Sequence, residues 1–574
     1  MLFFLKRFFC ILLSCTFLFY LENLFFSPIF KSEAIIIKWA IHPFNICTQY
    51  PKFWSIFKIL FHILFILSSM IISNRLFSHI FKNSHNRVLK KRKNFISQTG
   101  LVLLVGKDYY TKEFTFLTEK SLYQNILITG TIGSGKTSSA MYPFTKQLIS
   151  YQNYHPDKKL GMLILDVKGN FYKQVITYIN QSNRQKDLII VELGTTFSYN
   201  PLDKPNLKAS ILANRLKTIL LLFSDNNSDS YWLDKVEILL TYCIKFCRIY
   251  NNNYVTFQEI HNLITSKKYY LKKKQEIRNL FLKHNFSKEQ EFDLNSIINF
   301  FEKEFFSLDS RTTNIIISEV TRITNLFVSD YEVLSTFSPE KNRITFTGFS
   351  SVLKEGKIVV LNMPISEYKN LSKIIAAYLK LDFQTEVLLR LKESNLNFRS
   401  VAFICDEFHE YVNSTDADFF AQSREAKCIN IISTQSYTSL INSLNNVHST
   451  RVVIQSLVNK IWFRSDDLFT IEDAQKQLGK EEKEKISQNI SENAKETKFN
   501  YLLNSFNSKK SSLSEGYTKY FQSDFIYDTN FFTQELETFS CLSFLSDGNK
   551  ILKPRKLQMI PYFKEKGWII DEKK

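Results

Sequence analysis

The chain has 574 residues, 44% of them apolar and 22% charged, and a typical domain size of about 150 residues predicts three or four units. Aromatic residues make up 15% of the sequence, which excludes a wholly disordered chain. Eight cysteines without a Cys-x-x-Cys pair exclude a disulfide scaffold and argue against structural zinc. The net charge of +19 favours anionic partners such as nucleic acid, although an AT-rich genome would enrich lysine equally well.

Two apolar stretches near the N-terminus are long enough to cross a membrane, which takes about 20 residues. One runs from residue 8 to 26 with Glu22 as its only charge, and the other covers residues 53–73. Residues 74–93 then hold seven basic and no acidic side chains, so the positive-inside rule predicts a cytoplasmic body on a multi-pass anchor in the inner (cytoplasmic) membrane. The alternative is a cleaved signal peptide followed by a single span.

A phosphate-binding loop follows a short predicted strand at residues 124–129. The pattern GxxxxGK[ST] is complete, and a helical stretch begins at Ser138 directly after Gly130-Thr131-Ile132-Gly133-Ser134-Gly135-Lys136-Thr137. In such a loop the backbone N–H groups surround the phosphates, Lys136 reaches the β- and γ-phosphates, and the Thr137 hydroxyl binds Mg²⁺. The motif predicts a site for ATP and Mg²⁺ formed by residues 130–138.

A phosphate-binding loop also needs an acidic partner on a neighbouring strand. The apolar run 400–405 ends in Asp406-Glu407, which predicts a magnesium role for Asp406 and a role for Glu407 in polarising the attacking water. A second run, 162–165, ends in Asp166 and continues to Lys168. For Asp166 a turn at the end of a strand and a role near the nucleotide both remain open.

Further strands are predicted at four apolar segments, with amphipathic helical stretches between several of them: 187–192, 357–362, 429–433 and 460–463. Strands that alternate with helices indicate an α/β fold with a mainly parallel sheet covered on both faces. Ligands of such sheets bind at the carboxyl ends of the strands, where both proposed motifs lie.

Five motifs in order resemble the coupling ATPases of type IV secretion and conjugation, which are membrane-anchored motors related to the FtsK and HerA translocases. They are Gly130 to Thr137, Asp166-Val167-Lys168-Gly169, Tyr199-Asn200-Pro201-Leu202-Asp203, Asp406-Glu407-Phe408 and Ser433-Thr434-Gln435-Ser436. The resemblance covers the chain from the predicted membrane spans to about residue 565. One departure is Asn170, where the family usually carries an acidic residue.

The resemblance implies a RecA-like P-loop ATPase that assembles as a homo-hexamer. It also implies recruitment of a relaxase–DNA complex or a protein substrate and its transfer to the secretion channel. Lys136 and Glu407 would be catalytic, Gln435 would sense the γ-phosphate, and Arg424 would act on the nucleotide of a neighbouring subunit. The alternatives are a polar cap at a strand end for Gln435 and a solvated helix end for Arg424.

The predicted organisation inserts a helical domain into the nucleotide-binding domain. It consists of a two-helix anchor, a first nucleotide-binding part, an all-α insertion, a second nucleotide-binding part, and a linker with a C-terminal part that returns to the core (1–80, 81–225, 226–345, 346–480 and 481–574). In the insertion, residues 267–278 hold six basic side chains and one acidic one, with Tyr269 and Tyr270 among them. This segment is either a solvated helix face or a contact for DNA phosphates and bases.

Two other functions remain open. An FtsK/HerA-like membrane-tethered DNA translocase would be expected to end in a winged-helix DNA reader, for which residues 521–574 are short. A structural component of a secretion apparatus that does not hydrolyse nucleotide would have no need of Lys136, Thr137, Asp406 and Glu407 together.

Overall fold

The computed structural model describes residues 100–222, 230–283, 287–393, 398–493 and 512–564, the short strands Phe499–Asn500 and Ser505–Phe506, and seven isolated positions between 52 and 68. Among these residues no helix meets the length and hydropathy needed to cross a membrane. The two predicted spans lie outside the described residues, apart from those isolated positions. The chain divides into two compact units, and the fold described here belongs to the unit Leu101–Ile569.

An eleven-stranded mixed sheet forms the centre of this unit, in the order β2-β1-β15-β14-β9-β3-β8-β7-β4-β6-β5. The seven strands from β9 to β5 are parallel to their neighbours: β9 (Asn459–Phe463), β3 (Ile126–Thr129), β8 (Cys428–Thr434), β7 (Val401–Cys405), β4 (Gly161–Leu165), β6 (Ile358–Leu361) and β5 (Leu188–Val191). The remaining four add an antiparallel edge: β14 (Ser540–Phe544), β15 (Arg555–Gln558), β1 (Val102–Asp108) and β2 (Phe114–Thr118). The mainly parallel α/β fold predicted from the sequence is confirmed.

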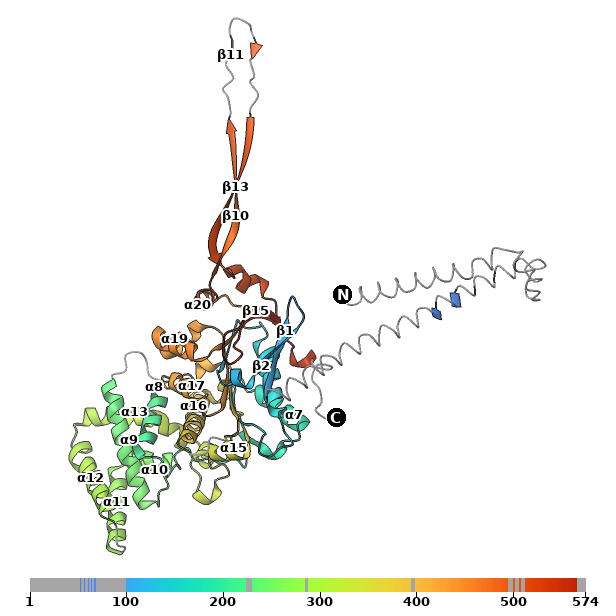
Figure 1. The fold of residues 1–574 in the computed structure, drawn as a ribbon. Coiled ribbons are helices and arrows are strands. Elements are labelled where there is room, and N and C mark those ends of the chain that lie inside the picture. Colours follow the sequence, from blue (N-terminus) through green and yellow to red (C-terminus); the bar gives the residue numbers. More distant parts are fainter. Residues whose placement is uncertain are drawn as a thin grey trace, which may run out of the picture. The chain divides into compact units, whose positions relative to one another are not determined.

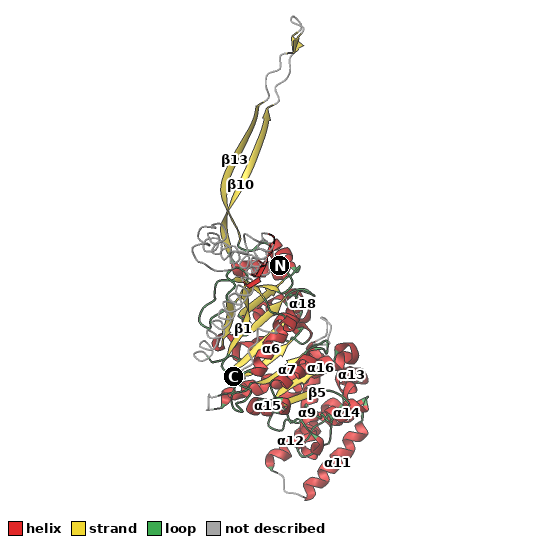
Figure 2. Cartoon of the chain, turned by 90° about the vertical axis from the view of Figure 1, so that its right-hand side faces the viewer, coloured by secondary structure: helices red, strands yellow, loops and turns green. Residues whose placement is uncertain are grey.

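Helices cover both faces of the sheet because its central strands are apolar on both sides. In β7, Phe403 belongs to one buried cluster and Ile404 to the cluster on the opposite face. One face carries α6 (Tyr142–Ser150) and α7 (Phe171–Gln181), which lie in front of the strands in Figure 2. The other carries α15 (Phe349–Glu355), α16 (Ile365–Leu389), α17 (Asp416–Gln422), α18 (Tyr437–Leu444) and α19 (Val447–Ser456).

Between β5 and α15 the described residues form helices and turns only (Figure 1). The helices are α8 (Ala209–Leu221), α9 (Ser230–Tyr250), α10 (Phe257–Thr265), α11 (Lys267–Lys283), α12 (Lys288–Asn299), the wide turn Phe300–Phe305, α13 (Ser310–Val328) and α14 (Tyr331–Phe337). The remaining helices are α5 (Glu119–Leu122) before the phosphate loop and α20 (Leu468–Leu478) after β9. The predicted domain boundaries themselves stay a prediction.

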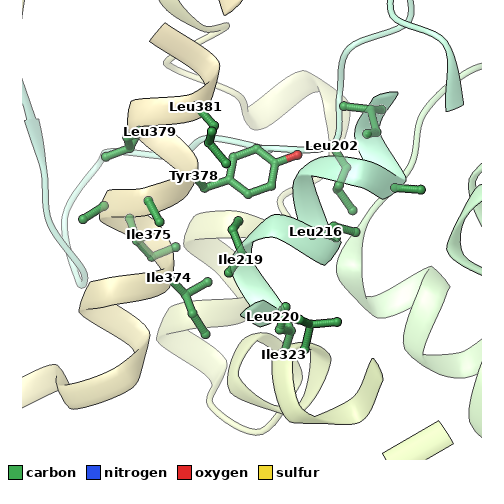
Figure 3. Close-up of a cluster of buried hydrophobic side chains, with 14 of the residues drawn as sticks. Leu202, Leu216, Ile219, Leu220, Ile323, Ile374, Ile375, Tyr378, Leu379 and Leu381 are labelled. Carbon is green, nitrogen blue, oxygen red and sulfur yellow. The ribbon is translucent and has the colours of Figure 1, made fainter. Parts of the chain in front are cut away.

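A continuous apolar contact joins the helical segment to the sheet. Figure 3 shows Leu216, Ile219 and Leu220 of α8 beside Ile374, Ile375 and Tyr378 of α16, with Ile323 of α13 next to them. Each of these side chains is at most 4% exposed, so this junction is as well shielded from solvent as the core of a domain.

A buried ionic cluster lies in the same junction. Asp382 of α16 is fully buried, and its two oxygens are 2.8 Å from Lys204 Nζ and 3.1 Å from Arg215 Nη1. The hydroxyl of Tyr199 donates to the same carboxylate at 2.6 Å. Burial favours the neutral acid, but the two cations and the tyrosine outweigh it and lower the pKa of Asp382. The motif around Asn200 is therefore tied directly to α16.

The segment 481–574, predicted to begin as a linker, starts instead with a long two-stranded ribbon in its described residues. Strands β10 (Lys480–Asn493) and β13 (Ser512–Phe525) pair in antiparallel register over their full length and run side by side in Figure 2. Tyr517 and Phe521 are exposed on it. Strand β10 is polar apart from Ile486 and Ile490, so both of its faces can lie in water, and composition alone does not distinguish such a strand from a loop.

Candidate nucleotide site

The phosphate loop connects β3 to a wide helical turn, Thr137–Met141, that continues into α6. Gly130 has a φ of 154°, and a Cβ atom there would lie 2.6 Å from Cβ of Phe463 on the adjacent strand β9. Gly135 has a φ of 98°, a region that strongly favours glycine. The loop therefore needs these glycines for both its turn and its close packing, as the motif predicts.

Lys136 lies inside this loop. Its side chain is buried, and the ammonium donates to the carbonyl oxygens of Gly130 and Thr131. Burial lowers the pKa of Lys136, while the nearby carboxylates of Glu407 and Asp406 oppose the shift. The loop thus holds a positive charge at its centre, where a phosphate group of a bound nucleotide would be attracted.

Thr137 and Asp406 face each other at the start of the helix. The Thr137 hydroxyl donates to Asp406 Oδ2 at 2.9 Å, and the Ser433 hydroxyl donates to Oδ1. Burial raises the pKa of Asp406, although both hydroxyl bonds counteract the rise. Two residues that are 269 positions apart are therefore brought together by the parallel order of β3, β8 and β7.

Glu407 lies beside Asp406 in a different environment. Its backbone is left-handed, with a φ of 51°, which is uncommon for a residue with a side chain. Lys168 Nζ donates to Glu407 Oε1 at 2.8 Å, whereas Oε2 is buried and accepts no hydrogen bond from the described residues. Burial would raise the pKa of Glu407, but the bond from Lys168 and the charges of Lys168 and Lys136 lower it.

Asp166 has the geometry of a turn residue. Its Oδ1 accepts from the backbone N–H of Lys168 at 3.0 Å, and its Oδ2 accepts from Asn170 and Phe171 at 2.9 Å each. These bonds close the turn after β4 and satisfy free donors at the first turn of α7. Of the two readings left open for Asp166, the geometry fits the structural one, and Asn170 takes part through its backbone.

Gln435 follows β8 directly, and its backbone carbonyl accepts from the N–H of Gly130 at 3.2 Å. It lines a cavity of about 790 Å³ beside the loop, together with Thr131, Ile132 and Arg464. The side chain thus lies near the phosphate loop, as its proposed sensing role requires.

Arg424 is placed differently. It follows α17 and is exposed, and among the described residues no hydrogen bond or ion pair joins its guanidinium to the phosphate loop of its own chain.

The basic segment 267–278 forms most of α11. Lys267, Lys268, Lys272 and Arg278 are exposed, whereas Lys273 and Lys274 pair with Glu276 and Glu302. Tyr270 is fully buried against Phe301, at a ring distance of 4.7 Å. Tyr270 therefore belongs to the core of the helical segment and is not available for stacking on bases, whereas the exposed basic side chains leave both possibilities for this segment open.

The residues at the loop fit a magnesium ion held together with a nucleotide. Magnesium takes oxygen ligands and usually keeps several waters, so it needs few protein groups. Thr137 offers a hydroxyl and Asp406 a carboxylate at hydrogen-bonding distance from each other. No cluster of three or more His, Cys, Asp or Glu side chains with metal-binding geometry occurs in the part of the chain that the structure describes.

Three residues near the site have contacts that the sequence did not predict. Ser433 bonds to Asp406, Lys168 bonds to Glu407, and the ring of Phe539 lies against Gly135. Ser433 and Lys168 stand in two of the five motifs named above, but the motifs do not indicate which carboxylate each side chain would contact. Phe539 carries no local signal, because its position depends on contacts between segments far apart in the sequence.

Comparisons with known proteins agree with this geometry. Residues 116–515, more than two thirds of the chain, match the model of the type IV secretion-system coupling protein DNA-binding domain. A search of curated proteins gave no match.

Among solved structures, the chain is similar to the bacterial conjugative coupling protein TrwBdeltaN70 in an unbound form, with 12% identity, a TM-score of 0.51, and coverage of 78% of this chain and 87% of that one. It is also similar to the plasmid coupling protein TrwB in complex with ADP and Mg²⁺, with 11% identity, a TM-score of 0.51, and coverage of 78% and 87%. At such low identity these similarities concern the fold, whereas the match over residues 116–515 establishes the family. The chain belongs to the family of type IV secretion-system coupling proteins.

Proposed function

We propose that this protein is the ATP-driven coupling protein of a type IV secretion or conjugation system. In this role it would recruit a relaxase–DNA complex or a protein substrate and pass it to the secretion channel. The observation that carries the proposal is the arrangement of Lys136, Thr137, Asp406 and Glu407 around one phosphate loop, in a chain of the coupling-protein family. The similar protein TrwB has been observed with ADP and Mg²⁺, and with an ATP analogue that is not hydrolysed.

We assign each residue a role in ATP binding and hydrolysis. The loop N–H groups of residues 130–138 and the Lys136 ammonium would hold the phosphates. Thr137 and Asp406 would hold Mg²⁺, which when bound neutralises charge on the β- and γ-phosphates. Glu407 has one carboxylate oxygen fixed by Lys168 and the other without a hydrogen bond from the described residues, which suits a group that orients the attacking water.

Two assignments concern the surroundings of the γ-phosphate. Gln435, beside the loop at the end of β8, would contact that phosphate. Arg424 would stabilise the transition state in a neighbouring subunit of a homo-hexamer, and its exposure and lack of a bond to its own phosphate loop suit such a role.

The membrane and DNA interactions are proposed on separate grounds. The apolar stretches 8–26 and 53–73 and the basic segment after them support an anchor in the inner membrane, with the ATPase body in the cytoplasm. The net charge of +19 and the exposed basic side chains of α11 support contact with DNA phosphates.

The function is tested by ATP hydrolysis of the full chain, purified in detergent, with and without single-stranded DNA. We expect Mg²⁺-dependent turnover in the parent protein and its loss in Lys136→Ala, because the ammonium contacts phosphates in both the ground state and the transition state. An Lys136→Ala variant that hydrolyses ATP at the parental rate would refute the proposed site.

A further inference from the structure

An aromatic ring from the C-terminal part of the chain lies directly against the phosphate loop. A Cβ atom on Gly135 would lie only 2.5 Å from Cδ1 of Phe539. The N–H of Phe539 donates to the carbonyl of Ser134 at 3.1 Å, and its own carbonyl accepts from the N–H of Met559 at 2.7 Å. The ring is therefore held in place by backbone bonds to the loop on one side and to the end of β15 on the other.

The backbone of Phe539 is strained at this position. Its φ is 65°, a left-handed conformation that is uncommon for a bulky side chain. Such conformations cost free energy and cluster at ligand sites. The ring is only partly buried, and Phe563, which is 56% exposed, packs edge-on against it at 5.9 Å. Tyr562 contacts Tyr142 of α6 at 5.3 Å and fixes this segment beside the helix of the phosphate loop.

The order of the strands places this ring at one particular end of the nucleotide. In loops of this kind the lysine contacts the β- and γ-phosphates, so Lys136 would hold that end of the nucleotide. The acidic pair Asp406-Glu407 follows β7, on the β8 side of β3. Phe539 precedes β14, which lies on the opposite side of β3, beyond β9. A nucleotide whose γ-phosphate faces Glu407 therefore directs its nucleoside towards the side that carries Phe539.

We propose that Phe539 and Phe563 form the subsite for the nucleobase, with the base stacked on these two rings. This inference rests on the proposed function, because it assumes that the loop binds a nucleotide. The cavity of about 790 Å³ is the competing location, since its lining extends from Gln435 after β8 to Arg464 after β9, but it has no aromatic side chain in its lining. A purine or pyrimidine base stacks favourably on an aromatic face.

The test compares two ligands that differ only in the nucleoside. The dissociation constants of ATP and of inorganic tripolyphosphate are measured by calorimetry, with Mg²⁺, on the full chain in detergent. We expect Phe539→Ala to raise the dissociation constant of ATP about tenfold, within the range known for stacking of a base on an aromatic ring, and to leave that of tripolyphosphate unchanged. Phe539→Tyr keeps the ring and should bind ATP as the parent does. Phe292→Ala removes an exposed ring on α12 and serves as the matched control.

Phe539→Leu guards against a simple packing defect, since leucine fills the space next to Gly135 without an aromatic face. Selective loss of ATP binding in this variant supports the subsite. Equal weakening of ATP and tripolyphosphate, or no change in either, would overturn it. Failure of the proposed function looks different, because the parent protein would then bind neither ligand, or Lys136→Ala would bind both normally.

Discussion

Asp406 and Glu407 are neighbours in sequence, yet their environments move their pKa values in opposite directions. Burial raises the pKa of Asp406, whereas Lys168 and Lys136 lower that of Glu407 despite its burial. Neighbouring carboxyl groups whose pKa values are shifted apart in this way generally serve different roles. This difference supports a magnesium role for Asp406 and a water-orienting role for Glu407, and it makes Lys168 the positioning residue of the pair.

Lys168→Met should therefore change the pH dependence of hydrolysis. Without the ammonium the pKa of Glu407 rises. Because Glu407 must be ionised to orient the attacking water, acidification should abolish activity at a higher pH in this variant than in the parent protein. The measurement is kcat from about pH 5 to pH 9, in which the acid limb of the profile should move upward. Lys168→Arg keeps the charge and should retain the parental limb. Coinciding acid limbs in Lys168→Met and the parent protein would remove Lys168 from this role.

Helix α16 connects the helical segment to the sheet through Asp382. A buried carboxylate that is paired with two cations cannot be neutralised without leaving charge unpaired in the interior. The same helix carries the apolar side chains of Figure 3, so charge and packing hold one junction together.

Asp382→Asn should accordingly destabilise the protein by about 3–5 kcal/mol, the range for breaking a buried pair. The measurement is the free energy of unfolding of the protein, obtained from a denaturant titration. Asp293→Asn, which breaks a half-exposed pair with Lys245, is the matched control and should cost less than about 1 kcal/mol. If both variants lost a similar amount of unfolding free energy, burial of the Asp382 cluster would not determine its contribution to stability.

The ribbon β10–β13 should be dispensable for folding. Its described side chains beyond the first few pairs are exposed or half-exposed, and Lys483 bonds to the backbone of Phe525 near its base. Replacing residues 484–521 by a short Gly-Ser turn should leave the melting temperature and ATP affinity close to parental values. A large loss of either would mean that the ribbon stabilises the core.

The sequence predicted the parallel strands well because each is an apolar run that is buried on both faces, as Phe403 and Ile404 illustrate. It also predicted the residues around the phosphate loop, since they follow strand ends that meet at one edge. The ribbon was not predicted because β10 is almost entirely polar and lacks the apolar alternation that indicates a half-buried strand. The burial of Tyr270 was not predicted, because a basic, aromatic segment does not indicate which of its side chains face the core.

In the whole assembly, the proposed role of Arg424 requires subunits that complete each other's sites. Mixing Arg424→Ala with Lys136→Ala creates some interfaces with an intact phosphate loop on one side and an intact arginine on the other. These should recover part of the ATP hydrolysis that each variant lacks alone, because an added guanidinium contributes a factor of about 10³ to 10⁵. Mixed assembly is verified with two affinity tags. Mixing Lys136→Ala with Glu407→Gln is the control, since both residues act in the same chain. Mixed rings without recovery would return Arg424 to a solvated helix end.

The most direct test of the proposed function is transfer of cargo by the native secretion system after the native gene is replaced by one encoding Glu407→Gln. The account predicts that this variant is produced and retained in the membrane, binds ATP, and no longer supports transfer. The matched control is Glu410→Gln, three residues away, which changes a carboxylate paired with Lys373 at 2.5 Å and should transfer normally. Normal transfer in Glu407→Gln would contradict the account.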